Sequence, residues 1–358
     1  MNNFTKIGVA LSLASLSSTA NAGLMFNITS TGNSQADAGF QLAADTISSL
    51  FKDDITVNIT AGFNSLRAGV LGQASSNREL FDFSSWKSGM ASDMTSTFDQ
   101  TMVSHLPTGD TFNPFMNGTG DNPHGAGSTE GYTDNDGGAN NSVVRLTRAN
   151  AKALGMYDSQ GSEEDAAITF SSDFSFDFDP TDGIEAGMID FVGVATHEIM
   201  HAMGFTSGID ILDYYTMSGP AGDLYSDDAF TFVTGLDFTR HSASSQAFNA
   251  DLDWTADSRE KYFSIDGGKT ALGTGSFSQG RYNGDGQQAS HWKDHRGVGI
   301  MDPTAAPAGN LNFVSDLDIV ALDVIGWDMS GAFAVPTPPI AFLFSIGLAG
   351  LFVSRRNN

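Results

Sequence analysis

The feature that most constrains this chain is a His-Glu-x-x-His pattern at residues 197–201, followed by a glycine at position 204. Residues four apart lie on one face of an α-helix, so His197 and His201 can hold one metal ion together. Glu198 then lies beside the metal, where its carboxylate can act as general base towards a water molecule. Imidazole ligands and hydrolytic chemistry both favour zinc, a redox-inert ion. The pattern therefore predicts a zinc site on a helix that ends at Gly204.

The alternative is a chance occurrence of this pattern on a surface helix. Only 7 of the 358 residues are histidine, so a chance occurrence is expected in roughly a few chains per thousand. Apolar residues also recur on one side of the predicted helix. They are Ile189, Val192, Val194 and Ile199. A helix with one buried side favours a metal site built into the fold over a chance match.

Charge and composition exclude several classes of function. The formal net charge is −25, which repels nucleic acids and anionic membranes, so we expect no nucleic-acid partner. The chain has no cysteine, which excludes disulfides, thiol catalysis and latency through a cysteine bound to the metal. Its hydrophobic content of 40% suffices for one large domain or for two lobes around a cleft.

Residues 1–22 have the pattern of a secretory signal peptide. Lys6 supplies the positive start, residues 7–16 form a short apolar core, and Ala20-Asn21-Ala22 matches the small-residue cleavage site. A buried N-terminal helix is the alternative, but it does not account for the Ala-x-Ala ending. We expect the chain to be exported through the inner membrane and the mature protein to begin near Gly23.

The C-terminal segment, residues 331–358, has the pattern of a second targeting signal. A proline-rich stretch at 335–339 precedes an apolar run at 340–353 and then Arg355-Arg356. The run is shorter than the roughly 20 residues that span a membrane, and the arginine pair fits the cytoplasmic side of a membrane. This order resembles the PEP-CTERM sorting signals of Gram-negative bacteria.

The resemblance implies that an exosortase-like protease recognises the tail and removes it. Thr337 stands where these signals usually have glutamate, and an ordinary tail anchor is the alternative. We expect a secreted or cell-surface protein of a Gram-negative bacterium, transiently anchored in the membrane by this segment.

Between the two ends, helical and strand patterns alternate irregularly, which predicts an α+β fold with a mixed sheet. Helices are expected at 38–52, 83–105, 150–154 and 315–325, and strands at 24–28, 54–60, 143–146, 167–170, 174–178 and 262–268. One of the strands at 167–170 and 174–178 is expected to border the cleft and to pair with an extended substrate. The alternative for both is an ordinary internal strand.

Residues 108–142 are rich in Gly, Asn and Asp and read as a long loop. The loop contains Asp134-Asn135-Asp136-Gly137-Gly138, whose closely spaced carboxylates suit calcium. It lacks the later glutamate of an EF-hand loop. A Ca2+ site and a solvated acidic loop are therefore the two alternatives.

Two stretches of the chain resemble the metzincin type of zinc metallopeptidase. The first is the His-Glu-x-x-His-x-x-Gly pattern within residues 197–205, and the second is a tight turn around Met301 within residues 290–303. The resemblance implies that Met301 forms the floor of the metal site. Pro303 occupies the position where some metzincins place a tyrosine on the metal, so that tyrosine is absent here.

A catalytic zinc normally has three protein ligands and a water. Most metzincins place the third ligand three residues after the glycine, where this chain has Ser207, a poor zinc ligand. Leishmanolysin-like members insert a segment there and place the third histidine shortly before the methionine turn. His291, ten residues before Met301, fits that arrangement and follows a flexible Gly-rich loop at 280–290. The alternatives for the third ligand are Asp210, His241 and His295.

The resemblance implies a metallopeptidase domain at 23–330, with an N-terminal lobe to about 206 and a C-terminal lobe at about 207–330 that carries His291 and the methionine turn. We expect a secreted zinc endopeptidase that acts on proteins or peptides, with His197, His201 and His291 as Zn2+ ligands and Glu198 as general base. One alternative is a cell-surface or biofilm-matrix protein with a non-catalytic metal site. Another is a zinc hydrolase that cleaves a different bond.

Overall fold

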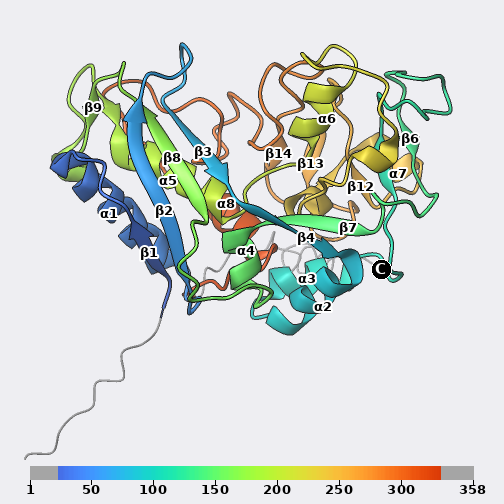
Figure 1. The fold of residues 1–358 in the computed structure, drawn as a ribbon, viewed down its shortest axis with the longest axis horizontal. Coiled ribbons are helices and arrows are strands. Elements are labelled where there is room, and N and C mark those ends of the chain that lie inside the picture. Colours follow the sequence, from blue (N-terminus) through green and yellow to red (C-terminus); the bar gives the residue numbers. More distant parts are fainter. Residues whose placement is uncertain (1–22, 332–358) are drawn as a thin grey trace, which may run out of the picture.

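A computed structural model describes residues 23–331. Its largest sheet has four strands in the order β1-β2-β8-β3, namely β1 (Met25–Ile28), β2 (Thr56–Asn64), β8 (Ala166–Ser171) and β3 (Gly72–Ser76). The first three are parallel, and β3 runs antiparallel to β8. Helices α1 (Ser34–Leu50) and α5 (Phe191–Met203) pack against each other and against this sheet (Figure 1). The predicted α+β class with a mixed sheet is therefore confirmed.

Aromatic rings join these two helices to the sheet. Phe191, the first residue of α5, contacts Phe40 of α1 at 5.2 Å and Phe170 of β8 at 4.3 Å between ring centroids. All three rings are buried, so each transfers a large apolar area out of water. This cluster fixes the start of α5 relative to the sheet.

Both ends of α5 are set by local chemistry. At the start, the Asp190 carboxylate accepts a hydrogen bond from the Gly193 amide, which satisfies one free helix donor. At the end, Gly204 adopts φ 118°, a left-handed conformation that favours glycine, and its amide bonds back into the last turn. The predicted helix end at Gly204 is confirmed.

The predicted helix at 83–105 is wrong in one respect, because it is divided into α2 (Phe83–Asp93) and α3 (Thr97–His105). Ser96 begins the second helix: its hydroxyl accepts from the Asp99 amide, and the Asp99 carboxylate accepts from the Ser96 amide. This reciprocal capping starts a new helix in place of continuing the old one. The same device begins the last helix, where the Ser315 side chain and Asp318 cap each other.

The remaining elements are short. The helices are α4 (Arg148–Ala153), α6 (Ile209–Tyr215), α7 (Ala243–Ala247), α8 (Asp316–Asp323) and the 3-10 turns Pro180–Asp182, Asp227–Ala229 and Leu236–Thr239. The strands form a pair, β4 (Arg78–Asp82) with β7 (Val143–Thr147); a second pair, β9 (Phe176–Asp177) with β10 (Ile189–Asp190); and two three-stranded sheets, β12 (Leu252–Asp253) with β5 (Pro114–Met116) and β6 (Tyr132–Thr133), and β11 (Arg240–His241) with β13 (Lys261–Phe263) and β14 (Ser276–Phe277).

The strand that borders the cleft is β3, which the sequence did not predict. The two candidates do not border it, because neither β8 nor β9 lines the cleft, and β8 is paired along both edges. For both, the alternative of an ordinary strand holds, with β9 reduced to two residues that pair with β10. The β3 sequence, Gly-Gln-Ala-Ser-Ser, lacks the branched and aromatic residues that signal a strand. One edge of β3 is free of strand pairing, because no other strand within residues 23–331 adds to this side of the sheet.

The segments before and after residue 206 share one hydrophobic core. Strand β12 pairs with β5, and the ring of Phe238 stacks on Trp86 of α2 with centroids 4.8 Å apart. The division into two lobes at this residue stays a prediction. No helix within residues 23–331 is long and apolar enough to cross a membrane, and the predicted signal peptide and C-terminal sorting segment lie outside the described residues, apart from Gly331.

The buried carboxyl group of Asp53 joins the start of the domain to its end. Asp53 is 8% exposed and accepts a hydrogen bond of 3.0 Å from the Asp328 amide. Burial, together with the nearby charges of Asp328 and Asp93, raises the pKa of Asp53 to about 8. The folded state therefore binds this proton more tightly than the unfolded chain does, so the contribution of Asp53 to stability decreases as pH rises from about 4 to about 8.

We expect Asp53→Asn to remove this loss of stability at higher pH. The side-chain amide oxygen of the variant still accepts a hydrogen bond from the Asp328 amide, and the side chain carries no charge. The free energy of unfolding of the variant relative to the parent, from denaturant titrations at pH 5 and pH 8, should shift in favour of the variant at the higher pH. The exposed neighbour provides the control, since Asp54→Asn should show no such shift. Equal pH dependence in parent and Asp53→Asn would contradict the assignment.

Candidate metal centre

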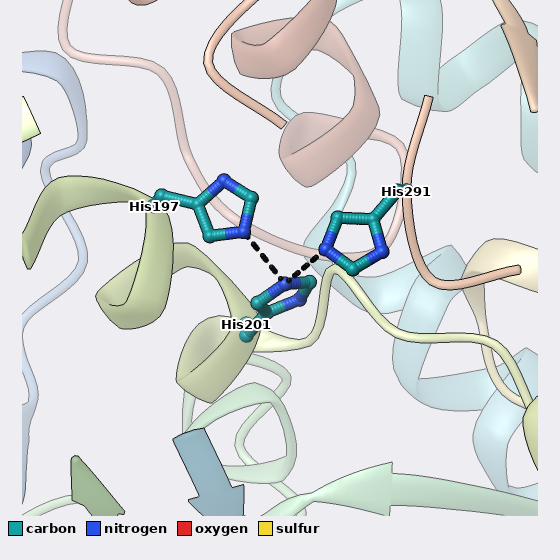
Figure 2. A group of neighbouring side chains, drawn as sticks. All are labelled: His197, His201 and His291. Atoms are coloured by element: carbon teal, nitrogen blue, oxygen red, sulfur yellow. Dashed lines mark hydrogen bonds between the residues drawn. The ribbon is translucent and has the colours of Figure 1, made fainter. Parts of the chain in front are cut away.

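Helix α5 places His197 and His201 on the same face, one turn apart, as predicted. Their Nε2 atoms lie 3.0 Å from each other (Figure 2). The third predicted ligand, His291, comes from the segment between β14 and α8 and faces the two helical histidines. Its Nε2 atom lies 3.2 Å from that of His201, and one ring nitrogen from each of the three lies within 4.8 Å of the others. These three histidines therefore lie close enough together to bind one metal ion.

The proton positions of the three rings follow from their outer nitrogens. Nδ1 of His197 is 2.7 Å from the Ile300 carbonyl, Nδ1 of His201 is 2.7 Å from the Phe205 carbonyl, and Nδ1 of His291 is 3.3 Å from the Gln288 carbonyl. A carbonyl only accepts, so each Nδ1 carries the proton and each Nε2 keeps a lone pair. Three lone pairs that face one another cannot hydrogen-bond among themselves, and only an electron acceptor satisfies them together.

A tetrahedral zinc ion fits this spacing. Zinc binds imidazole nitrogen at about 2.0–2.1 Å, which places two such nitrogens about 3.3 Å apart. The measured separations of 3.0 and 3.2 Å are close to that value. Metal-binding histidines usually donate a hydrogen bond from the ring nitrogen that does not bind the metal, and the carbonyls at Nδ1 accept such bonds here. These hydrogen bonds fix the tautomer and the orientation of each ring.

The electrostatics of the group also favour metal binding. Burial lowers the pKa of all three histidines. The pKa of His201 falls well below its ordinary value, and that of His291 falls to about 3. For His201 the neighbouring imidazoles add to the effect of burial. The rings are therefore neutral at physiological pH, and a neutral imidazole is the form that binds a metal.

His291 is held in place by the residues on either side of it. The Asp210 carboxylate accepts hydrogen bonds from the Ala289 amide at 2.7 Å and from the Ser290 hydroxyl. On the other side, the Trp292 ring packs against Phe205, just beyond the end of α5, with centroids 5.0 Å apart. Asp210, an alternative candidate for the third ligand, thus positions the segment that carries His291 and is not in the metal-binding group.

The turn around Met301 supports the same histidines through one buried carboxylate. Asp318, at the start of α8, accepts from the Ile300 amide at 2.9 Å, the Met301 amide at 3.2 Å and the Trp292 indole at 2.8 Å. The Ile300 carbonyl then accepts from His197. Gly299 is required here, because a Cβ atom would lie 2.0 Å from the Asp318 carboxylate. Met301 itself is fully buried in this turn.

The other candidate ligands lie elsewhere. The Ser207 hydroxyl donates to Asp237, and His241 is buried with its Nε2 3.1 Å from the Phe238 carbonyl. His295 is exposed and lies next to Asp294. Among residues 23–331 no second group of three such side chains lies as close together, and the carboxylate of Asp134 accepts hydrogen bonds from its own loop. Calcium binding at that loop stays a prediction.

Glu198 lies beside the three histidines and is 5% exposed. Burial raises the pKa of Glu198 to about 8, and a hydrogen bond from the Ala74 amide offsets part of this shift. A metal cation at the histidines would favour the charged form and lower that pKa. Strand β3 approaches the carboxylate closely: a Cβ atom at Gly72 would lie 3.0 Å from its Oε1 atom. A larger residue at this position would push the carboxylate aside by a few tenths of an ångström.

The site opens into a cleft of about 1090 Å³. One wall is formed by β3 and the loop before it, residues 67–76, and the floor by α5. The opposite wall is formed by the start of α6 and by residues 281–307. The cleft is larger than a typical small-molecule pocket and leaves room for several residues of an extended chain.

Comparisons with protein-family models, with curated proteins and with solved structures found no match. The chemistry of the site is therefore inferred from its own residues. These are three converging imidazoles, one buried carboxylate beside them and an open cleft above both.

The sequence did not reveal two residues that build the site, Gly72 and Asp318. Gly72 stands in an unremarkable polar stretch and carries no signal of its own. Asp318 had a usable signal, because Ser315-x-x-Asp318 is a capping pattern at the start of a helix. That pattern predicts where the helix begins, but not that the same carboxylate holds the Met301 turn.

We expect His291→Ala to weaken zinc binding by about 100-fold or more, because two imidazoles then remain where catalytic zinc normally has three protein ligands. Zinc affinity by competition with a chromophoric chelator checks this. The exposed His295→Ala is the matched control and should bind zinc as the parent does. Asp210→Asn should give an intermediate loss, since it leaves the ligands intact and loosens the segment that carries one. Unchanged affinity in His291→Ala would exclude it as a ligand.

Proposed function

We propose that this protein is a secreted zinc endopeptidase of the metzincin type. The observation that carries the proposal is the convergence of three imidazole lone pairs beside a buried carboxylate at the floor of an open cleft. A non-catalytic zinc site normally has four protein ligands and needs no base, whereas this group contains three histidines and leaves one position open. The displaced third ligand, His291, agrees with a leishmanolysin-like arrangement.

The proposed reaction divides the work between the ion and Glu198. Bound at the three histidines, zinc supplies a Lewis acid that acidifies a water molecule and polarises the peptide carbonyl. Glu198 accepts a proton from the attacking water while the new C–O bond forms. The same carboxyl group then donates that proton to the amine nitrogen as the C–N bond breaks. The products are a carboxylic acid and an amine, which become a carboxylate and an ammonium group once the second water proton passes to the amine.

The free edge of β3 supports a polypeptide substrate over other hydrolysable compounds. This edge borders the cleft, and Gly72 within it lies beside Glu198. An extended peptide can add to such an edge through main-chain hydrogen bonds, which hold any sequence in register. The peptide bond next to the paired segment would then lie above the histidines. A zinc hydrolase for small molecules needs no such edge.

Export and surface location are part of the same proposal. They rest on the signal-like residues 1–22 and on the resemblance of the tail to sorting signals read by an exosortase-like protease. A secreted peptidase of a Gram-negative bacterium, briefly anchored by its tail, accounts for both patterns. The absence of cysteine leaves the active fold independent of redox conditions outside the cell.

We expect Glu198→Gln to retain zinc and to lose activity by at least about 10²-fold, because the ligands remain and the base does not. Casein hydrolysis and zinc content, measured on the same preparation, separate the two properties. Glu130→Gln provides the control, since that side chain is 69% exposed and should leave both unchanged. Near-normal turnover by fully zinc-loaded Glu198→Gln would remove the residue from the mechanism. Absence of casein hydrolysis in the zinc-loaded parent would remove the proposed function itself.

The tail should determine location and not activity. The residues that line the cleft end at Asn312, and Ser330 is held by a hydrogen bond of 2.9 Å from its amide to the Leu50 carbonyl. We expect a chain truncated after Ser330 to hydrolyse casein like the full chain and to appear in the culture medium, while the full chain is first found in the membrane fraction. A truncated chain that fails to fold would place the domain boundary beyond Ser330.

A further inference from the structure

Three arginines that line the cleft have no partner within the described residues. The side chains of Arg67, Arg78 and Arg281 make no hydrogen bond and no ion pair there, and Arg281 only lies near the ring of its neighbour Tyr282. A guanidinium offers five donors in a rigid fork, and removing it partly from water without a partner is costly. Arg78 is half-buried, so this cost applies to it most directly, and the nearby carboxylates of Asp210 and Asp237 offset only part of it through charge attraction without direct contact.

The other arginines of the described residues are all engaged. Their partners are carboxylates or backbone carbonyls, for Arg145, Arg148, Arg240, Arg259 and Arg296. Arg145 and Arg240 hydrogen-bond only to backbone carbonyls, and Nε and Nη1 of the buried Arg240 have no hydrogen-bond partner. The arginines of residues 23–331 whose side chains make no hydrogen bond and no ion pair at all nevertheless line one cleft.

The three positions follow the path proposed for the substrate. Arg67 lies in the loop before β3, and Arg78 lies two residues after this strand ends, so they lie beyond its two ends. The five residues of β3 extend over about 16 Å, close to the length of a bound pentapeptide. Arg281 belongs to the opposite wall. Arg78 lines the same cleft as the three histidines.

Three acidic residues line the same cleft. Glu198 is the proposed base, and Asp210 is occupied by the Ala289 amide and the Ser290 hydroxyl. Asp302 remains, with one buried carboxylate oxygen that has no hydrogen-bond partner. Once zinc is bound, the uncommitted charge of the cleft is positive, while the protein as a whole is strongly negative.

We propose that Arg67, Arg78 and Arg281 bind carboxylate side chains of the substrate, so that the enzyme selects acidic polypeptide segments on both sides of the bond it cleaves. This inference rests on the proposed peptidase function. Arginine and carboxylate form paired, charge-assisted hydrogen bonds, which specify geometry as well as charge. The cleft attracts such a segment locally against the general repulsion of the acidic surface, because low-dielectric walls concentrate its field.

Two fluorogenic peptides of equal length test the inference, one with glutamate flanking the cleaved bond and one with glutamine at the same positions. We expect the glutamate peptide to have a kcat/KM about 10-fold higher at low salt, and the ratio to approach one in about 1 M salt. Arg67→Gln, Arg78→Gln and Arg281→Gln should each reduce the ratio several-fold, whereas the corresponding lysine variants should retain part of it. Arg296→Gln, which removes the same charge outside the cleft, should leave the ratio unchanged.

Binding to zinc-loaded Glu198→Gln separates this inference from the peptidase proposal. We expect the labelled glutamate peptide to bind about 10-fold more tightly than the glutamine peptide, as measured by fluorescence anisotropy. This preference should be lost when the three arginines are also replaced by glutamine in the Glu198→Gln variant. Arginine-dependent binding without cleavage by the parent would overturn the peptidase proposal and retain the anion site. Equal kcat/KM for the two peptides, or a preference that survives all three substitutions, would overturn the inference. If polygalacturonate displaces the labelled peptide at lower concentration than the unlabelled glutamate peptide does, the inference would be overturned in favour of an acidic polysaccharide as the ligand.

Discussion

Three imidazole lone pairs that face one another form the constraint on which the rest of this structure depends. Without a cation they repel, and no hydrogen bond can join them, because each ring proton is engaged on the far side of its ring. Holding the rings in place therefore lowers the stability of the fold. Such a cost is common in preorganised binding sites, where binding of the ligand restores stability to the folded state.

The supports of this arrangement converge from distant parts of the chain. The aromatic packing around Phe191 fixes the start of α5, and Gly204 ends the helix so that the Phe205 carbonyl can accept from His201. The carboxylate of Asp318 binds both the turn that supports His197 and the indole next to His291. Hydrogen bonds to a carboxylate contribute about 1.5–3 kcal/mol each, so this one buried residue couples two of the three ligands. A disturbance of α8 is therefore transmitted to the metal site.

Charge is distributed in two opposed ways. The acidic surface repels other anions, while the cleft contains three arginines without a hydrogen bond or ion pair, near the site proposed for zinc. In the proposed peptidase, an acidic segment would be repelled by the outer surface and would gain its favourable contacts only inside the cleft. The proposed selectivity for acidic segments therefore depends on the attraction inside the cleft exceeding the repulsion outside it.

Local features of this chain were predictable from its sequence. The positions of His197, Glu198 and His201 on one helix follow from helical periodicity, and Gly204 and Ser315 mark helix ends through preferences that act over four residues or fewer. The amphipathic pattern of 38–52 likewise gave the first helix. The pattern at 83–105 failed because continuous helical periodicity does not reveal that the Ser96 cap begins a second helix.

The tertiary structure alone decided how these pieces combine. Of the candidate third ligands, His291 lies next to His201 in the fold although 90 residues separate them in the chain. Asp210, another candidate, instead accepts a hydrogen bond from the segment that carries His291. The fold also placed the weakly patterned strand β3 at the free edge of the sheet and set Gly72 against Glu198. Such contacts depend on the packing of segments that are remote in sequence, and no local propensity encodes them. The sequence thus determined which groups can carry the chemistry, and folding determined where they meet, because proximity between distant residues arises only from the packed core.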